Sequence, residues 1–137
     1  MSWLLDTIVL SEIRKGDRAD DRVRDWFAGI RSEELFTSVL VLGEVRRGIE
    51  LRRRRDVPSA LALEQWLVRL STTFGSRVLP IDAAVAERWG LINAPDPLPT
   101  VDGLLAATAL VHDLTLVTRD VRAVERTGVA LLDPWAA

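Results

Sequence analysis

Residues 3–16, WLLDTIVLSEIRKG, join a short apolar segment to an acid and then to a helix-forming run. Ser2–Leu5 is brief and apolar, which predicts a buried strand. The strand runs directly into Asp6, and a helix is predicted over Ile8–Lys15 with its end at Gly16. A strand that leads at once into a helix is the basic unit of an α/β fold.

The same alternation of strand and helix continues to the end of the chain. The predicted strands are Ser2–Leu5, Leu35–Ser38, Val78–Ile81, Leu114–Thr118 and Val129–Leu132. The later helices are predicted from apolar spacing at Val23–Ile30, Val39–Arg54, Pro58–Phe74, Ala83–Leu91 and Thr100–His112. A short helical turn is expected over Arg119–Arg126. This order favours a three-layer α/β/α domain around a mainly parallel sheet.

Helix boundaries are indicated by capping residues and by one loop. Asp82 and Thr100 are predicted to cap the helices that follow them. Residues 93–99 contain three prolines and are predicted to form a loop.

Composition limits the class of protein. A length of 137 residues with 48% apolar residues favours one domain over residues 1–137, with a hydrophobic core of its own. The chain has no cysteine, which excludes disulfides and cysteine metal sites and fits a cytoplasmic location. We expect no signal peptide, because the start lacks a basic leader. No apolar run reaches the roughly 20 residues that a membrane helix needs.

Four acids are expected to gather at one edge of the sheet. Asp6 follows the first strand, and Asp120 follows the strand Leu114–Thr118. Ligands of open parallel sheets collect beyond the carboxyl ends of the strands. Glu44 lies on a predicted helix, and Asp102 lies early in another on the face that carries its apolar residues. Carboxylates in one cleft repel each other unless a cation neutralises them, and Mg²⁺ and Mn²⁺ prefer oxygen ligands.

Each acid also has a purely structural interpretation. Asp6 and Asp120 are plausible helix N-caps, Asp102 could interact with the helix dipole, and Glu44 could be a surface residue. The shared placement favours metal-assisted hydrolysis, for which the chain is equipped. With His112 as the only histidine and no cysteine, a triad or a zinc site is poorly supplied.

The sequence resembles PIN domains, and in particular the FitB-like branch of the VapC toxins of bacterial toxin–antitoxin pairs. The segments that carry the resemblance are WLLDTIVLSEIRKG (3–16), TSVLVLGEVRRGI (37–49), LPIDAAVAERWG (79–90), PTVDGLLAATALVHDLTLVTRD (99–120) and GVALLDPW (128–135). They cover essentially the whole chain in order. A PIN-like α/β/α fold is therefore expected.

The resemblance implies an endoribonuclease toxin that depends on Mg²⁺ or Mn²⁺. It matches Asp6, Glu44, Asp102 and Asp120 to the acidic quartet of the family, with Asp6, Asp102 and Asp120 as metal ligands. Thr118 matches a small hydroxyl residue near that site. The implied partners are RNA as substrate, a VapB-like antitoxin whose C-terminal tail covers the cleft, and a second copy of the chain in a homodimer.

Arg46 and Arg47 follow Glu44 directly and are candidate RNA-binding residues, because a guanidinium group suits phosphate oxygens. They begin an arginine-rich run to Arg55 that could instead bind an acidic segment of a partner or remain solvated. Trp135, beside Pro134, is predicted either to pack against the first strand or to contribute to an oligomer interface.

One position departs from the family pattern and leaves an alternative open. Ile8 stands where the family commonly has a polar residue such as Asn. The chain could therefore be a catalytically silent PIN domain that serves as a protein- or nucleic-acid-binding module. A phosphatase of the haloacid-dehalogenase class is a further alternative, but Asp6-Thr7-Ile8 lacks the second acid of its Asp-x-Asp motif.

Overall fold

The computed structural model describes residues 1–136, and its strands form one five-stranded sheet. Every strand pair is parallel, in the order β3-β2-β1-β4-β5. The strands are β1 Trp3–Leu5, β2 Leu35–Ser38, β3 Val78–Leu79, β4 Thr115–Val117 and β5 Leu131–Leu132. The predicted α/β/α fold with a parallel sheet is confirmed.

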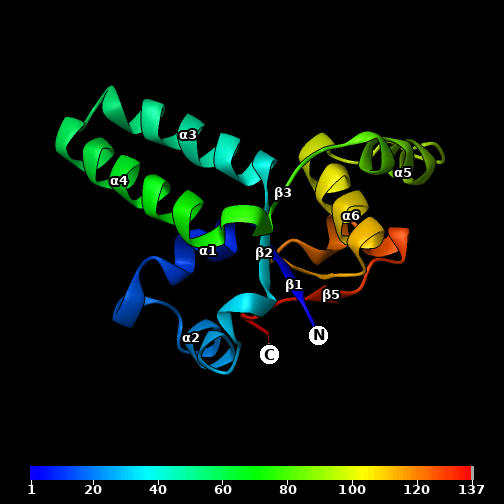
Figure 1. Ribbon diagram of the computed structural model, residues 1–137, viewed down its shortest axis with the longest axis horizontal. Helices are drawn as coiled ribbons and strands as arrows, with labels where there is room; N and C mark the ends of the chain where they lie inside the picture. The colour runs from blue at the N-terminus through cyan, green and yellow to red at the C-terminus, as the bar shows by residue number, and fades with distance from the viewer. Residues whose placement is uncertain (137) are drawn as a thin grey trace.

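Helices cover both faces of the sheet (Figure 1). They are α1 Thr7–Ile13, α2 Asp21–Ala28, α3 Val39–Arg53, α4 Val57–Phe74, α5 Ala83–Asn93 and α6 Thr100–His112. In Figure 1, α1 to α4 lie on one side of the strands, while α5 and α6 lie on the other. Chain order explains this division: the crossovers that build β1 to β3 use the first face, and the crossover back to β4 uses the second.

The direction in which strands are added to the sheet reverses between β1 and β4. From β1 the sheet grows outward to β2 and β3 in one direction and to β4 and β5 in the other. Asp6 N–H donates to the carbonyl of Val117 at 3.1 Å, which ties the ends of β1 and β4 together. The carboxyl ends of these two strands therefore form the switch point at which open α/β sheets bind ligands.

The core is built on the central strands. Leu4 and Leu5 of β1 and Val117 of β4 are fully buried, together with Val41 of α3 and Leu105 of α6 at 1% exposure or less. Burial of each leucine stabilises the fold by about 1.5–3 kcal/mol. Within residues 1–136, none of the helices combines the length and apolar character required to cross a bilayer.

Local sequence explains most helix starts, with one correction. Asp82 caps α5 by accepting a hydrogen bond from the Val85 N–H at 3.0 Å, as predicted. Ser38 caps α3 in the same way through the Leu40 N–H. The prediction that Thr100 caps α6 is wrong. Pro99 occupies the N-cap position, and Thr100 is already the first helical residue.

Several predicted boundaries also differ from the structure. Helix α1 ends at Ile13, and a separate 3-10 turn begins at Gly16. Gly16 has a φ of +60°, a backbone conformation that favours glycine. Helix α2 ends at Ala28, so Ile30 lies outside it although it packs on the core. The single turn expected after Arg119 is two 3-10 turns, Val121–Ala123 and Glu125–Thr127.

Candidate active site

Asp6 stands at the centre of the site because β1 ends one residue before it. Its backbone is extended, and its side chain caps α1, with Oδ1 accepting a hydrogen bond from the Thr7 N–H at 2.6 Å. Oδ2 accepts a hydrogen bond from the Thr118 hydroxyl at 2.7 Å. The capping interpretation of Asp6 is therefore correct, and the cap also fixes the carboxylate at the switch point.

Thr118 connects the acids that follow β1 and β4. The residue is 3% exposed. Its hydroxyl donates to Asp6 and accepts a hydrogen bond from the Asp120 N–H at 3.2 Å. The hydroxyl therefore uses its only proton on Asp6 while it orients the backbone that carries Asp120.

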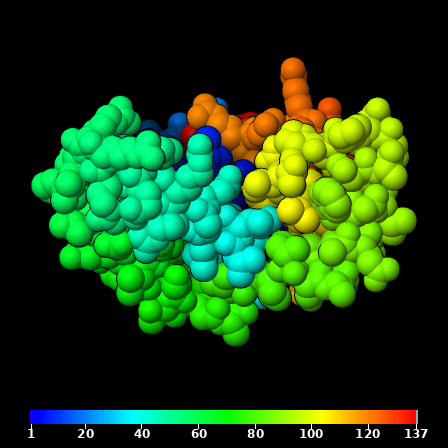
Figure 2. All heavy atoms as spheres, turned by 90° about the horizontal axis from the view of Figure 1, so that it is seen from above, coloured from blue at the N-terminus to red at the C-terminus, as the bar shows by residue number. Residues whose placement is uncertain are grey.

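The four predicted acids line one cleft of about 620 Å³. Its walls are formed by Asp6, Thr7, Ile8, Ser11, Glu44, Asp102, Thr118, Arg119 and Asp120. Figure 2, which views the molecule of Figure 1 from above, shows α3 with α4 and α5 with α6 as two lobes on either side of a recess, in which N-terminal residues are visible in blue. The Thr7 hydroxyl donates a short hydrogen bond to Glu44, which links the start of α1 to α3.

Mutual repulsion shapes the electrostatics of the cleft. Burial raises the pKa of Asp6, hydrogen bonds from Thr118 and Thr7 oppose this, and the charges of Glu44 and Asp120 raise it again. Burial also raises the pKa of Asp102, and the charges of Asp6, Asp120 and Glu44 add to that effect. The charges of Glu44 and Asp120 thus act on both Asp6 and Asp102, which is the like-charge arrangement that a cation relieves.

The donor set fits a hard divalent cation, although the acids do not form a closed cage. Among residues 1–136, no three or more His, Cys, Asp or Glu side chains are arranged as a ready-made metal site. Mg²⁺ does not require such a cage, because it keeps several waters and is usually held by one or two carboxylates. The carboxylates of Asp102 and Asp120 accept no hydrogen bond from any described residue, so their oxygens are free to act as ligands.

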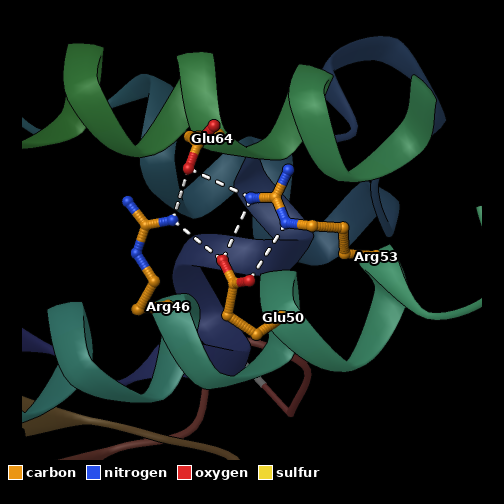
Figure 3. A network of polar contacts seen from close by, with 4 residues as sticks. All are labelled: Arg46, Glu50, Arg53 and Glu64. Carbon is orange, nitrogen blue, oxygen red and sulfur yellow. Dashed lines mark hydrogen bonds and ion pairs between the residues drawn. The ribbon is translucent and has the colours of Figure 1, made fainter. Parts of the chain in front are cut away.

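The arginine candidates lie outside this cleft. Arg46 donates to Glu50 at 3.1 Å and to Glu64 at 2.6 Å, and Arg53 contacts the same two acids (Figure 3). Arg47 is exposed and has no ion pair within the described chain. RNA binding by Arg46 and Arg47 stays a prediction, and for Arg46 it competes with an existing network of ion pairs.

Three residues of the cleft, Thr7, Ser11 and Arg119, were missed by the sequence analysis. Thr7 donates a hydrogen bond to Glu44. The feature of the sequence that could have indicated Thr7 is a hydroxyl residue directly after Asp6 at a helix start. Arg119 lines the cleft between Thr118 and Asp120, and its position beside a candidate ligand was the available signal. Trp135 is buried at 6% exposure and packs on the core, which agrees with the packing interpretation.

Comparison with known proteins agrees with this geometry. The family model of the PIN domain matches residues 3–129. This chain is a PIN domain. The match removes the phosphatase alternative, and the predicted family is confirmed.

Relatives of the PIN domain are similar along their full length. Toxin FitB of Neisseria gonorrhoeae is 32% identical, with 96% of this chain and 97% of that protein aligned. VapC ribonuclease Y4jK of Sinorhizobium fredii is 28% identical, with 96% of each chain aligned. The crystal structure of FitAcB from Neisseria gonorrhoeae superposes with a TM-score of 0.89 at 30% identity, over 98% of this chain and 99% of that one.

Proposed function

We propose that this PIN domain is a metal-dependent endoribonuclease and the toxin of a toxin–antitoxin pair of the VapBC kind. The observation that carries the proposal is the convergence of Asp6, Glu44, Asp102 and Asp120 in one cleft at the switch point of the sheet. Full-length similarity to the FitB toxin and to a VapC ribonuclease supports the toxin and ribonuclease assignments.

The proposed metal ligands are Asp6, Asp102 and Asp120, acting directly or through water. A bound Mg²⁺ or Mn²⁺ supplies an activated water and stabilises the charge that develops on the phosphate. Thr118 holds the Asp6 carboxylate in place through its hydroxyl. Glu44, which accepts the Thr7 hydrogen bond at the cleft wall, is assigned to orient the attacking water.

The test is RNA cleavage by purified protein with and without chelator. We expect activity to disappear in EDTA and to return with Mg²⁺ or Mn²⁺, because the proposed nucleophile is a water that the metal activates. An Asp6→Asn variant purified in parallel controls for contaminating nucleases. Undiminished cleavage in EDTA by the wild-type preparation alone would reject the metal mechanism.

The proposed partners are a VapB-like antitoxin, whose tail covers the acidic cleft, and a second copy of the chain. Solved structures of similar chains are described as FitAcB and as FitAB bound to a DNA fragment, at 30% and 29% identity. Mass measurement of the purified chain, alone and with the antitoxin, tests both partners. A monomer at all concentrations would reject the homodimer.

The silent-module alternative rests on Ile8, which is 46% exposed and lines the cleft. Ile8 does not replace any of the four acids, and all four line the same cleft as Ile8. A titration of Mn²⁺ into the purified protein separates the two functions. Absence of metal binding would favour the silent module, whereas binding that Asp102→Asn weakens supports the enzyme.

A further inference from the structure

Arg119 is a basic side chain on the wall of an otherwise acidic cleft. It follows β4, between Thr118 and Asp120, and it is exposed. Among the described residues that line the cleft, it alone is positively charged. A phosphodiester chain that approaches four carboxylates meets repulsion, so a cation at this position is well placed to offset it.

The guanidinium group of Arg119 is not paired with any of these acids. Within residues 1–136 it forms no ion pair and no hydrogen bond. By contrast, Arg46 and Arg53 each contact two carboxylates. The guanidinium lies instead over the ring of Trp135, 4.9 Å from the ring centroid.

Trp135 provides a fixed support for this contact. The residue is 6% exposed and belongs to the hydrophobic core, and its backbone N–H donates to the Asp133 carboxylate at 2.9 Å. The segment before it is joined to the cleft, since the Thr118 N–H donates to the Leu132 carbonyl at 3.0 Å. The indole face therefore holds the cation beside the acids and away from direct pairing with them.

We infer that Arg119 binds a phosphate of the RNA strand next to the one that is cleaved, and that Trp135 is the residue that positions it. This inference rests on the proposed ribonuclease function. A guanidinium that stacks on a ring keeps its N–H donors in the plane free, and that edge matches the oxygens of a phosphate. Separation from the acids leaves the carboxylates available for the metal and the guanidinium available for RNA.

The first experiment measures binding of a labelled single-stranded RNA in EDTA, where cleavage does not interfere, from roughly 50 to 200 mM salt. Arg119→Gln should reduce the slope of log affinity against log salt by about 0.7, the value for one phosphate contact on a single strand. Arg69→Gln is the matched control, because Arg69 is exposed on α4 and lines no part of the cleft. Its slope should equal that of the wild type.

The second experiment measures cleavage with Mg²⁺ or Mn²⁺. Arg119→Gln should raise KM roughly tenfold or more, the loss expected for a hydrogen bond to a charged group. The kcat should change little, since the contacted phosphate does not react. A fall in kcat with KM unchanged would contradict this role.

Trp135 is tested by a double-mutant cycle on the salt slope and on KM. Trp135→Leu should reproduce the effect of Arg119→Gln on both quantities. Trp135→Phe keeps an aromatic ring and should retain most of the wild-type salt slope and KM. The double variant Trp135→Leu with Arg119→Gln should be no worse than Arg119→Gln alone. Additive effects would reject the positioning role. Thermal melts verify folding, and Trp135→Phe keeps the test valid if the leucine variant does not fold.

The outcomes separate this inference from the proposed function. If the wild type cleaves RNA with metal and Arg119→Gln has the wild-type slope and KM, the inference alone is overturned. The same holds if Arg119→Gln weakens only the binding of the antitoxin, which would assign Arg119 to a protein partner. If the wild type neither binds nor cleaves RNA, the proposed function fails and the inference fails with it.

Discussion

The acidic cleft gathers four carboxylates and one guanidinium group, that of Arg119, whereas the ion-pair network between α3 and α4 pairs two arginines with two glutamates, so only the network balances its charges. In the network, Arg46 and Arg53 of α3 contact Glu50 of α3 and Glu64 of α4 at 2.6–3.1 Å (Figure 3). In the cleft, four carboxylates line one cavity, and Arg119, the one basic residue among its described lining residues, lies over a tryptophan ring.

The difference appears in the direction of the pKa shifts. Hydrogen bonds from Arg53 lower the pKa of Glu50, and hydrogen bonds from Arg46 lower the pKa of Glu64. In the cleft, burial and neighbouring acids raise the pKa of Asp6 and Asp102. The network stabilises its charged forms within the fold, whereas the cleft needs a partner from outside the chain. Unbalanced charge in a partly buried cleft is thus what marks this cleft as the candidate functional site.

The largest expected effect is the contrast in activity between the two clusters. Asp6→Asn should reduce cleavage at least about 100-fold, because it removes a proposed metal ligand where even supporting residues cost 10–100-fold. Glu64→Gln should leave cleavage unchanged, since Glu64 does not line the cleft. Rate measurements at saturating Mg²⁺ provide the comparison. Equal losses in both variants would mean that the clusters do not differ in function.

Thr118 offers a more moderate test. Thr118→Val removes the hydroxyl that donates to Asp6 while keeping the shape of the side chain, and metal affinity should fall about 10–100-fold. Thr118→Ser retains the hydroxyl and should restore most of the affinity. Calorimetric titration with Mn²⁺ measures both. Unchanged affinity in Thr118→Val would remove Thr118 from the support of the site.

Local patterns in the sequence were sufficient for the fold. Apolar runs located the five strands, and the capping role of Asp82 followed from a rule that needs only neighbouring residues. The N-cap of α6 was assigned wrongly to Thr100, because it lies one residue earlier, at Pro99. The exact first residue of a helix depends on backbone angles, which local sequence does not specify to within one residue. The position of the acids after β1 and β4 followed from the parallel order of strands.

Contacts between distant side chains could not be predicted in this way. The pairing of Arg46 with Glu64 depends on how α3 and α4 are rotated against each other. The stacking of Arg119 on Trp135 likewise depends on where the segment after β5 lies. Sequence alone therefore indicated that the four acids lie in one cleft, but not which residues the arginines contact.

The most direct test of the account compares stability without metal, in denaturant melts in EDTA. The raised pKa of Asp102 means that its stabilising contribution is complete below its ordinary value of 3.8 and is lost as pH rises through the raised value. Asp102→Asn removes that loss. At pH 7 the free energy of unfolding of the variant should exceed that of the wild type by about 0.5–1 kcal/mol. The gain is small because solvent screens the charge of the partly exposed Asp102. The gain should vanish near pH 4.

Glu64→Gln is the matched control with the opposite sign. The pKa of Glu64 is lowered, so its contribution is present above 4.5 and is lost as pH falls through the lowered value. At pH 7 this variant should be less stable than the wild type. The Asp102→Asn protein should be more stable than the wild type in EDTA yet inactive with Mg²⁺. An Asp102→Asn protein that is destabilised by about 0.3–1 kcal/mol and fully active would instead make Asp102 an ordinary first-turn acid and contradict the account.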